Sequence, residues 1–342
     1  MATIVDVAKH AGVSVATVSR ILNGKTKVRE ELRLRVMDSV KSLEYTPNAA
    51  ARNLRRNESG TILILAPNIT NPYYTHIIAG IGDAAHEHGY SSFLCNTAND
   101  RSREKELLTR LEHQQADGAI LLATELGAEW LIPYAQKFPI VQCSEFDPKV
   151  DIVHVSIDNY GAATEAMEHL LALGHKRIGL ISSLNHYYST VLRTKAYYDA
   201  LDRANITVRE EYAGKATFDY TFKSGSDVAR SLLSQEARPT ALFCISDMLA
   251  LGAISSAKEM GFRVPEDVTI VGFDDVEHTM MFHPYLTTVS QPCFDIGYQA
   301  MQQLFRLMSG EEPARELIIP HKLEIRESSA HRYLDPPWIG QP

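Results

Sequence analysis

The chain has 342 residues, of which 45% are hydrophobic and 22% charged, and its formal net charge is −8. At about 100–200 residues per domain, this length predicts two or three domains. The composition excludes disordered, collagen-like and disulfide-rich classes. No apolar run approaches the roughly 18 residues of a membrane helix, and the start MATIVDVA does not resemble a secretion signal. The four cysteines form no CxxC pair, which favours single thiols in a reducing cytoplasm over a metal site.

The charge is unevenly distributed along the chain. Residues 1–58 carry eleven Lys and Arg against six Asp and Glu, so this head is +5. The whole-chain totals of 34 basic and 42 acidic residues leave 23 and 36 in residues 59–342, a charge of −13. A basic head on an acidic body is typical of a nucleic-acid contact confined to one end. A helical face that happens to be basic would give the same count, so charge alone leaves both interpretations open.

The head begins with two predicted short helices. Thr3 and Asp6 form a capping box that starts the first helix. Gly12 suits the chain reversal after it, and Ser14 is a good cap for a second helix over Val15–Leu22. Two short helices joined by a tight turn are the helix-turn-helix pattern.

A third helix, over about Glu30–Leu43, carries apolar residues at core spacing and closes this mini-domain. On the second helix, Arg20 can reach guanine O6 and N7 with two hydrogen bonds. The hydroxyls of Ser14, Thr17 and Ser19 suit phosphate oxygens. The alternative is an arginine on the solvated face of a small bundle. The side chains predicted to be exposed on the second helix are Val15, Ala16, Thr17, Ser19 and Arg20.

A short basic segment, NAAARNLRR at residues 48–56, follows the head. Nine residues are too few for a stable isolated helix, so it is expected to fray until something packs on it. Leu54 stands among arginines. It is either a wedge between base steps of the minor groove or a linker residue that contacts the body.

The body, residues 59–330, alternates short apolar strands with amphipathic helices, which predicts doubly wound parallel sheets. TILILAPNITNPYY and RIGLISSLNHYY each run from a strand through a polar loop to a tyrosine pair. Two such related halves would surround one cleft with their strand-end loops. The expected strands are Thr61–Ala66, Gly118–Leu122, Arg177–Ser182, Thr240–Ile245 and Val268–Phe273, and the expected helices include Arg103–Gln115 and Tyr160–Leu173.

Enzyme motifs are weak in this chain. A GxGxxA match at Gly80 lies deep in a predicted helix, where it cannot cradle a pyrophosphate. An SxxK match at Ser255 lies in an alanine-rich helix without companion motifs, and neither a P-loop nor GxSxG occurs. The chain is therefore predicted not to be an enzyme and to need no cofactor or metal.

Aromatic and polar residues at predicted strand ends suit a small neutral ring such as a sugar or nucleoside. In isolation each has a structural explanation, with Tyr73 as a core residue and Arg193 with Asp274 as a surface ion pair. These strand-end candidates are Tyr73, Tyr74, Arg193, Tyr220 and Asp274.

The segments TIVDVAKHAGVSVATVSRILNG and YTPNAAARNLRRN resemble the DNA-binding head and hinge of the lactose-repressor (LacI/GalR) family. The similarity continues to about residue 330. It implies that the second helix reads the major groove and that Leu54 opens the minor groove. The DNA contacts expected from the resemblance are Thr3, Ser14, Val15, Ala16, Thr17, Ser19, Arg20, Asn23, Ala51, Leu54 and Arg55, and the effector contacts are Tyr73, Tyr74, Ser189, Arg193, Tyr220 and Asp274.

The predicted protein is a cytoplasmic, nucleoid-associated homodimer that binds palindromic operator DNA. It would repress an operon of carbohydrate or nucleoside metabolism under control of a nucleoside or sugar. A tail with Pro336-Pro337 and no leucine heptad argues against a tetramer. The alternative, a solute-binding protein of the same two-lobed fold, would need a signal peptide and no basic head. The expected organisation is an all-α head (1–46), a hinge (47–58), a two-lobed α/β periplasmic-binding-protein-like domain (59–330, with an N-lobe at about 59–160 and 290–320 and a C-lobe at about 161–289 and 321–330) and a tail (331–342).

Overall fold

The computed structural model describes residues 2–22, 28–45 and 58–329, and the chain divides into two units, Met1–Ser59 and Gly60–Pro342. The hinge prediction over residues 47–57 and the tail prediction lie outside the described residues. So do four of the expected DNA contacts, Asn23, Ala51, Leu54 and Arg55.

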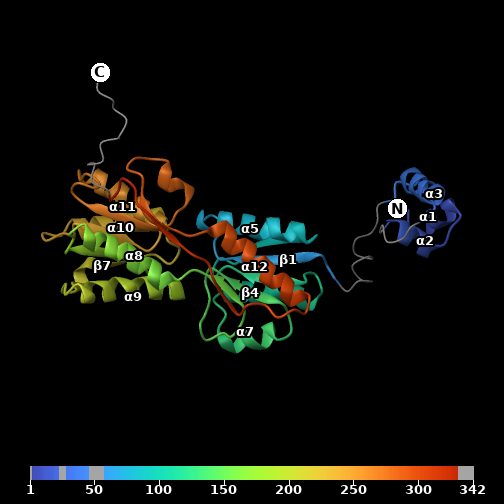
Figure 1. The fold of residues 1–342 in the computed structure, drawn as a ribbon, viewed down its shortest axis with the longest axis horizontal. Coiled ribbons are helices and arrows are strands. Elements are labelled where there is room, and N and C mark those ends of the chain that lie inside the picture. Colours follow the sequence, from blue (N-terminus) through green and yellow to red (C-terminus); the bar gives the residue numbers. More distant parts are fainter. Residues whose placement is uncertain (1, 23–27, 46–57, 330–342) are drawn as a thin grey trace, which may run out of the picture. The chain divides into compact units, whose positions relative to one another are not determined.

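The head is a bundle of three helices, α1 (Ile4–Ala11), α2 (Val15–Leu22) and α3 (Glu30–Ser42) (Figure 1). The first lies between the predicted capping box and Gly12, the second has the bounds predicted from the sequence, and the third ends one residue early. Val7, Val18 and Val36, one from each helix, are fully buried against one another. A hydrogen bond of 3.0 Å between His10 Nδ1 and Ser39 Oγ joins α1 to α3.

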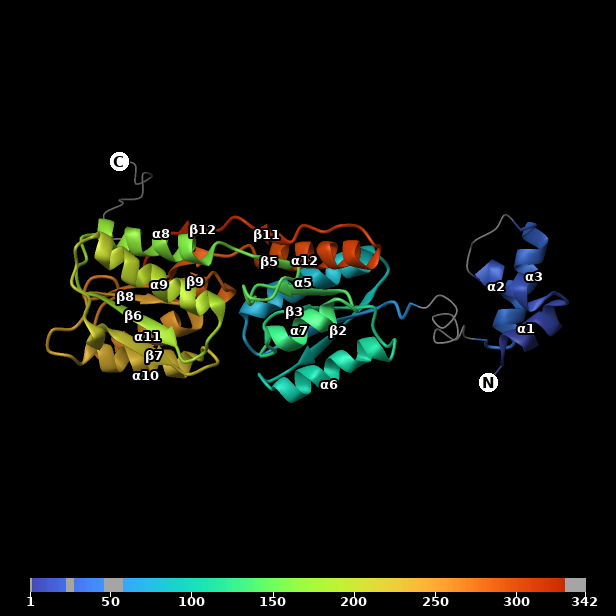
Figure 2. The ribbon, with the colours of Figure 1, turned by 90° about the horizontal axis from the view of Figure 1, so that it is seen from below.

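The second unit contains two six-stranded sheets, each at the centre of a lobe (Figure 1). In the N-lobe the strand order is β11-β5-β4-β3-β1-β2, and all of its pairings are parallel. Helices α5 and α12 cover one face of this sheet, and α6 and α7 cover the other (Figure 2). The strands are β1 (Thr61–Ala66), β2 (Ser91–Asn96), β3 (Gly118–Leu121), β4 (Ile140–Cys143), β5 (His154–Ser156) and β11 (Glu316–Ile318), and the helices are α5 (Tyr73–Glu87), α6 (Arg101–Glu112), α7 (Ala128–Ala135) and α12 (Cys293–Met308).

The C-lobe repeats this plan with the order β12-β10-β9-β8-β6-β7, but its last pairing, between β10 and β12, is antiparallel. Helices α8 and α9 lie on one side of the sheet and α10 and α11 on the other (Figure 2). The strands are β6 (Ile178–Ser183), β7 (Ala213–Ala216), β8 (Ala241–Cys244), β9 (Thr269–Asp274), β10 (Thr287–Ser290) and β12 (Lys322–Glu324), the helices are α8 (Asn159–Ala172), α9 (Tyr188–Arg203), α10 (Phe222–Leu233) and α11 (Asp247–Glu259), and the short 3₁₀ turns are Glu210–Tyr212 and Glu277–Met280.

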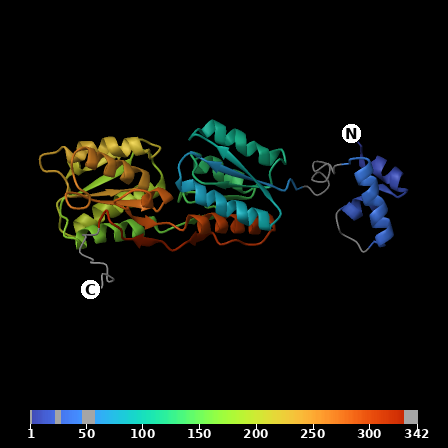
Figure 3. The same ribbon diagram turned by 90° about the horizontal axis from the view of Figure 1, so that it is seen from above.

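The chain passes between the two sheets three times, after β5, after β10 and after β11. The last passage is the red stretch of chain in Figure 3. Each lobe is therefore built from two separate stretches of sequence. The five predicted strands are all present, with ends that differ from the prediction by at most one residue.

The two motifs that resembled enzyme signatures are helical. Gly80 lies in the middle of α5, where a Cβ atom would come within 2.0 Å of the Phe294 carbonyl oxygen on α12. This glycine allows two helices to cross closely, and it has no phosphate-binding loop around it. Ser255 and Lys258 lie in α11. Among the described residues, no helix is both long enough and apolar enough to cross a membrane.

Candidate nucleic-acid interface and ligand cleft

Local hydrogen bonds set the start of each of the first two helices. The Thr3 backbone amide donates to Asp6 Oδ2 at 2.9 Å and the Asp6 amide donates to Thr3 Oγ1 at 3.4 Å, which is the predicted capping box. Gly12 follows with φ +63, a left-handed conformation that favours glycine. Ser14 Oγ then accepts from the Thr17 amide at 3.2 Å. These capping interactions determine where α1 and α2 begin and the direction of α2 after the turn.

The outer face of α2 carries the expected DNA-reading residues. Val18 points into the head core, whereas Ala16 and Arg20 are exposed. The sequence prediction that Val15, Thr17 and Ser19 are exposed was wrong, because all three are half-buried, and Val15 packs against the core beside Val18. The exposed part of α2 therefore combines a small side chain with a long cationic one, which suits close approach to a groove.

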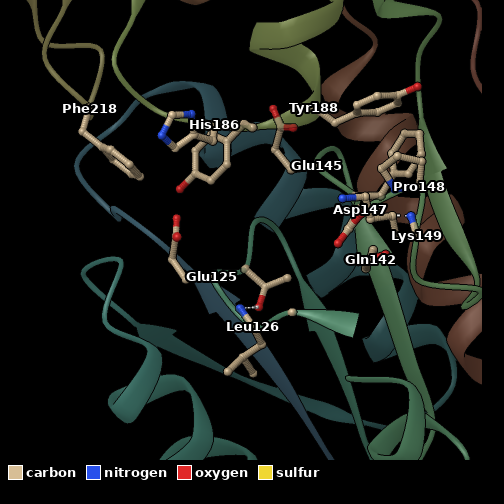
Figure 4. A pocket seen from close by; sticks show the side chains of 14 residues that line it. Glu125, Leu126, Gln142, Glu145, Asp147, Pro148, Lys149, His186, Tyr188 and Phe218 are labelled. Carbon is tan, nitrogen blue, oxygen red and sulfur yellow. Dashed lines mark hydrogen bonds between the residues drawn. The ribbon is translucent and has the colours of Figure 1, made fainter. Parts of the chain in front are cut away.

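A cavity of about 430 Å³ lies between loops of the two lobes. Figure 4 shows carboxylates and aromatic rings around it. Its N-lobe walls follow β3 and β4, and its C-lobe wall comes from the loops before α9 and after β7. The lining residues are Thr124, Glu125, Leu126, Gly127, Gln142, Glu145, Phe146, Asp147, Pro148, Lys149, His186, Tyr187, Tyr188 and Phe218.

Behind this cavity, a hydrogen-bonded chain runs from the N-lobe to the C-lobe. The Tyr73 hydroxyl lies 2.7 Å from Ser144 Oγ and donates to Gln291 Oε1 at 3.0 Å. Gln291 Nε2 donates to Asp274 Oδ1 at 2.8 Å. Gln291 lies directly after β10, on a segment that passes between the lobes. These hydrogen bonds therefore join Tyr73 of the N-lobe and Asp274 of the C-lobe to that connecting segment.

Arg193 and Asp274 form a buried ion pair, with Arg193 Nη1 3.6 Å from Asp274 Oδ1. The explanation of this pair as a surface contact was therefore wrong. Arg193 Nε also donates to Asn159 Oδ1 at 2.9 Å, and its guanidinium stacks on the Phe273 ring. Burial raises the pKa of Asp274 well above its ordinary value, and the adjacent Arg193 opposes this shift.

Two further contacts cross directly between the lobes. Ser189 donates from its hydroxyl and its amide to the Glu145 carboxylate, and the Tyr187 hydroxyl donates to Asn99 Oδ1 at 2.8 Å. Removal of Glu145 from water raises the pKa of its carboxyl group, which the bonds from Ser189 partly offset. These contacts hold the start of α9 against the N-lobe.

Residues with strained backbone also occur near this cleft. Ser144, Tyr220, Asp274 and Asp275 all have positive φ angles, of 74°, 53°, 126° and 62°. Non-glycine residues adopt such angles at a cost, and they are found most often at ligand sites. Tyr220 is held by a 2.6 Å contact between its hydroxyl and Thr190 Oγ1.

The six expected effector contacts are brought to this cleft by four different segments, but none of the six lines the cavity. Tyr73, Tyr74, Ser189, Arg193 and Asp274 are buried behind it, and Tyr220 is half-buried. Sequence reasoning missed Glu125, Gln142, Glu145, Asn159 and Gln291. Gln291 directly follows β10 and Glu145 lies two residues after β4, but neither strand was among those predicted from the sequence.

Comparison with known proteins agrees with both units. Residues 3–48 match the model of the lacI family of bacterial regulatory proteins, and residues 167–329 match a periplasmic binding protein-like domain. The chain is 40% identical to the HTH-type transcriptional repressor CytR of Escherichia coli strain K12 over 311 residues, which cover 91% of each protein.

Solved structures extend the similarity to 96% of the chain. The lac repressor dimer bound to operator and the anti-inducer ONPF aligns with a TM-score of 0.87 and 27% identity, covering 96% of this chain and 99% of that one. The transcriptional regulator CelR in complex with cellobiose aligns with a TM-score of 0.71 and 29% identity, covering 96% and 100%. A helix-turn-helix head, two lobes of matching strand order and these relatives lead to one conclusion: the chain belongs to the lacI family of bacterial regulatory proteins and is a DNA-binding transcriptional repressor.

Proposed function

We propose that this repressor binds palindromic operator DNA as a cytoplasmic, nucleoid-associated homodimer and is controlled by a nucleoside or sugar bound between its lobes. The observation that carries the DNA part is α2, whose capped start and buried Val18 leave Arg20 and Ala16 exposed on one face. The relative solved with operator has the same architecture over almost its whole length. The proposed activity is binding, without catalysis.

In this proposal the residues of α2 divide into two roles. Arg20 reads a guanine, and Ala16 lets the helix backbone approach the base edges. Thr17, Ser19 and the residues at the helix starts, Thr3 and Ser14, contact phosphates and fix the register. Val15 supports the helix from the core side and touches DNA only at its half-exposed edge. Asn23, Ala51, Leu54 and Arg55 are proposed to contact DNA on the sequence resemblance alone.

Arg20→Ala tests the base-reading role. It should cost about 1–3 kcal/mol of specific binding and relax the preference at one base position, because the bidentate contact is lost. Binding is measured by titration against the selected operator and against random DNA. Arg33→Ala is the matched control, since Arg33 is exposed on α3 and paired with Glu30. Equal losses on both DNAs would show that Arg20 contacts only phosphate.

The effector part rests on the cleft. Polar groups, aromatic rings and strained backbone from both lobes converge there, and a relative was solved with cellobiose. Ser189 is proposed to sense the ligand because it bonds to Glu145, which lines the cavity from the opposite lobe. Tyr73, Arg193 and Asp274 form the floor behind the ligand and transmit lobe closure through Gln291.

A thermal-shift screen of nucleosides and monosaccharides tests this part, because a ligand that binds only the folded state must raise its stability. Once such a compound is identified, Ser189→Ala should weaken effector binding about tenfold. The reason is that this variant loses the hydroxyl hydrogen bond from Ser189 to the Glu145 carboxylate of the opposite lobe. Operator binding without effector should remain unchanged. An unaltered effector response in the variant would place the ligand elsewhere.

The dimer requires apolar surface outside the cleft. On the edge strand β2, Phe93 and Leu94 are 59% and 46% exposed, an arrangement that a second copy would cover. Light scattering of the full chain at micromolar concentration should give a dimer, unchanged when residues 333–342 are removed. Phe93→Asp should give a monomer. A tetramer that the truncation dissociates would contradict the proposal.

A further inference from the structure

The cavity between the lobes is acidic. Three carboxylates line it, Glu125, Glu145 and Asp147, while the cationic side chains among its lining residues are Lys149 and, when protonated, His186. No arginine lines it, because Arg193 lies behind the cavity in its ion pair with Asp274. Glu145 is engaged by Ser189, and Asp147 Oδ1 accepts from the Lys149 amide at 2.9 Å.

Glu125 differs from these two because its carboxylate remains available. The buried Glu104 below it accepts from Thr124 Oγ1 at 2.7 Å and from the Glu125 amide at 3.2 Å, so the backbone of this loop is fixed. The Glu125 side chain then extends into the cavity toward His186 and Phe218 (Figure 4). In the part of the chain that the structure describes, no hydrogen bond reaches its carboxylate. Removal from water raises the pKa of Glu125.

Gln142 supplies an independent sign that a ligand group belongs here. It lines the same cavity from β4 and is fully buried, yet neither Nε2 nor Oε1 has a hydrogen-bond partner among the described residues. A buried carboxamide without partners is destabilising, so such groups in native proteins usually have a role. Its donor and acceptor suit the hydroxyl or amino group of a ligand that reaches this end of the cavity.

One feature that would attract an anion, a helix N-terminus at the cavity, already faces a carboxylate. Gly127 lines the cavity and caps the N-terminus of α7, a position where free amides favour negative charge. The carboxylate of Glu129, in the first turn, lies against Gly127, where a Cβ would come within 2.3 Å of Glu129 Oε2. Glu129 also pairs with Arg101, whose Nη2 lies 3.1 Å from Glu129 Oε1, so the helix end and this arginine both face a carboxylate.

We propose that this cavity selects an unphosphorylated effector and that Glu125 is the specificity-determining residue that rejects its phosphate monoester. This rests on the proposed function, in which a nucleoside or sugar binds between the lobes. The hydroxyl or amino donors of the free compound bond to Glu125 and Gln142. A phosphate monoester carries nearly two negative charges, and placing it beside Glu125 and Glu145 in a partly enclosed site is repulsive.

The test compares each free compound with its phosphate ester on the full-length protein. Ribonucleosides with their 5′-monophosphates, and ribose and hexoses with their terminal phosphates, are titrated by calorimetry. We expect at least one free compound to bind and its ester to bind about tenfold more weakly or worse. Glu125→Gln, which keeps the shape and removes the charge, should narrow this ratio to about twofold. Glu106→Gln, an exposed glutamate of α6 outside the cavity, should leave the ratio unchanged.

The outcomes separate this inference from the proposed function. An ester that binds as tightly as its free compound overturns the inference and leaves the proposed function standing. Failure of every free compound and ester to bind overturns both. An unchanged ratio in Glu125→Gln removes Glu125 as the selector. If that variant melts early, Glu125→Asp keeps the charge and should retain the discrimination, and loss of discrimination there would also contradict the assignment.

Discussion

The N-lobe and the C-lobe both place acidic residues at the ends of their third and fourth strands in chain order, or within four residues after them. In the N-lobe these are Glu125 after β3 and Glu145 after β4, and both line the ligand cavity. In the C-lobe they are Asp247 after β8 and Asp274 at the end of β9, and neither lines it. The two lobes share a strand order, but the acidic residues at the strand ends face the ligand cavity only in the N-lobe.

The difference lies in which donors surround each carboxylate. Asp247 is fully buried and accepts from the Val276 amide at 2.9 Å and from Thr288 Oγ1 at 2.6 Å, so it ties the β9–β10 loop to α11. Asp274 accepts from Gln291 and pairs with Arg193. The C-lobe acids are satisfied by their own scaffold, whereas Glu125 is left for a ligand. The comparison teaches that a strand-end carboxylate becomes a recognition group only when the fold leaves it without an internal donor.

The lobes also share a packing device. In the N-lobe, α5 and α12 cross at Gly80 and Gly297, and in the C-lobe α10 and α11 cross at Gly225 and Gly252. A Cβ at any of the four would lie within 2.0–2.5 Å of a backbone carbonyl oxygen of the facing helix. Backbone atoms cannot rotate away as a side chain can, so these crossings depend on glycine.

The largest expected effect comes from a substitution that pushes apart the two helices at one of these crossings. Gly80→Ala should lower the free energy of unfolding by about 3 kcal/mol, because the methyl group forces α5 away from α12. Gly82→Ala is the control on the same helix, since a Cβ there meets no atom within 4 Å. It should stabilise by about 0.5–1 kcal/mol through helix propensity. Urea unfolding of the full chain measures both, and similar values for the two variants would disprove the close crossing.

The next largest effect is the pH dependence of the free energy of unfolding that the buried Asp247 produces. Burial raises the pKa of Asp247 to about 6, so the folded state holds this proton more tightly than the unfolded chain does. The resulting stabilisation is complete below about pH 4 and is lost as pH rises through about 6, a change of about 2–3 kcal/mol. Asp247→Asn should remove this contribution and leave those of Asp274 and Glu145, whose pKa values burial also raises. Asp202→Asn, on the exposed end of α9, should leave the full dependence. Unfolding curves between pH 4 and 7 that match the wild type in both variants would contradict the assignment.

A smaller effect distinguishes a tyrosine hydrogen bond between the two lobes from a tyrosine hydrogen bond within one lobe. Tyr187→Phe removes the bond to Asn99 across the cleft, and Tyr197→Phe removes a 2.8 Å bond to the Ile178 carbonyl inside the C-lobe. Each should cost about 1 kcal/mol of stability. Only Tyr187→Phe should also weaken binding of the effector, measured by calorimetry. If Tyr197→Phe weakens it equally, the cross-lobe bond has no special part in closure.

The smallest stability effect is expected for Glu125. Because no described residue donates to its carboxylate, Glu125→Gln should change the free energy of unfolding by less than about 0.5 kcal/mol. The same urea experiment used for Gly80→Ala measures it. A loss comparable to that of Gly80→Ala would show that Glu125 belongs to the scaffold, and the contrast between the lobes would fail.

The sequence by itself determined the local features of this protein. The Thr3–Asp6 box, Gly12 and Ser14 set the bounds of α1 and α2 because capping depends on residues three or four apart in the chain. The ends of the five predicted strands were correct to within one residue, since their apolar runs are continuous in buried parallel sheets. The alternation of strands and helices also predicted the doubly wound lobes.

Only the tertiary structure decided how distant residues are used. The sequence cannot show that Gln291 links Tyr73 to Asp274, that Glu104 fixes the loop of Glu125, or that Gly80 meets the backbone of α12. From the sequence, Arg193 and Asp274 could equally be a surface ion pair or effector contacts, whereas the fold buries them together as an ion pair. The physical reason is that burial and partner choice arise from contacts between segments about 20 to more than 200 residues apart, and these contacts exist only once both sheets have formed.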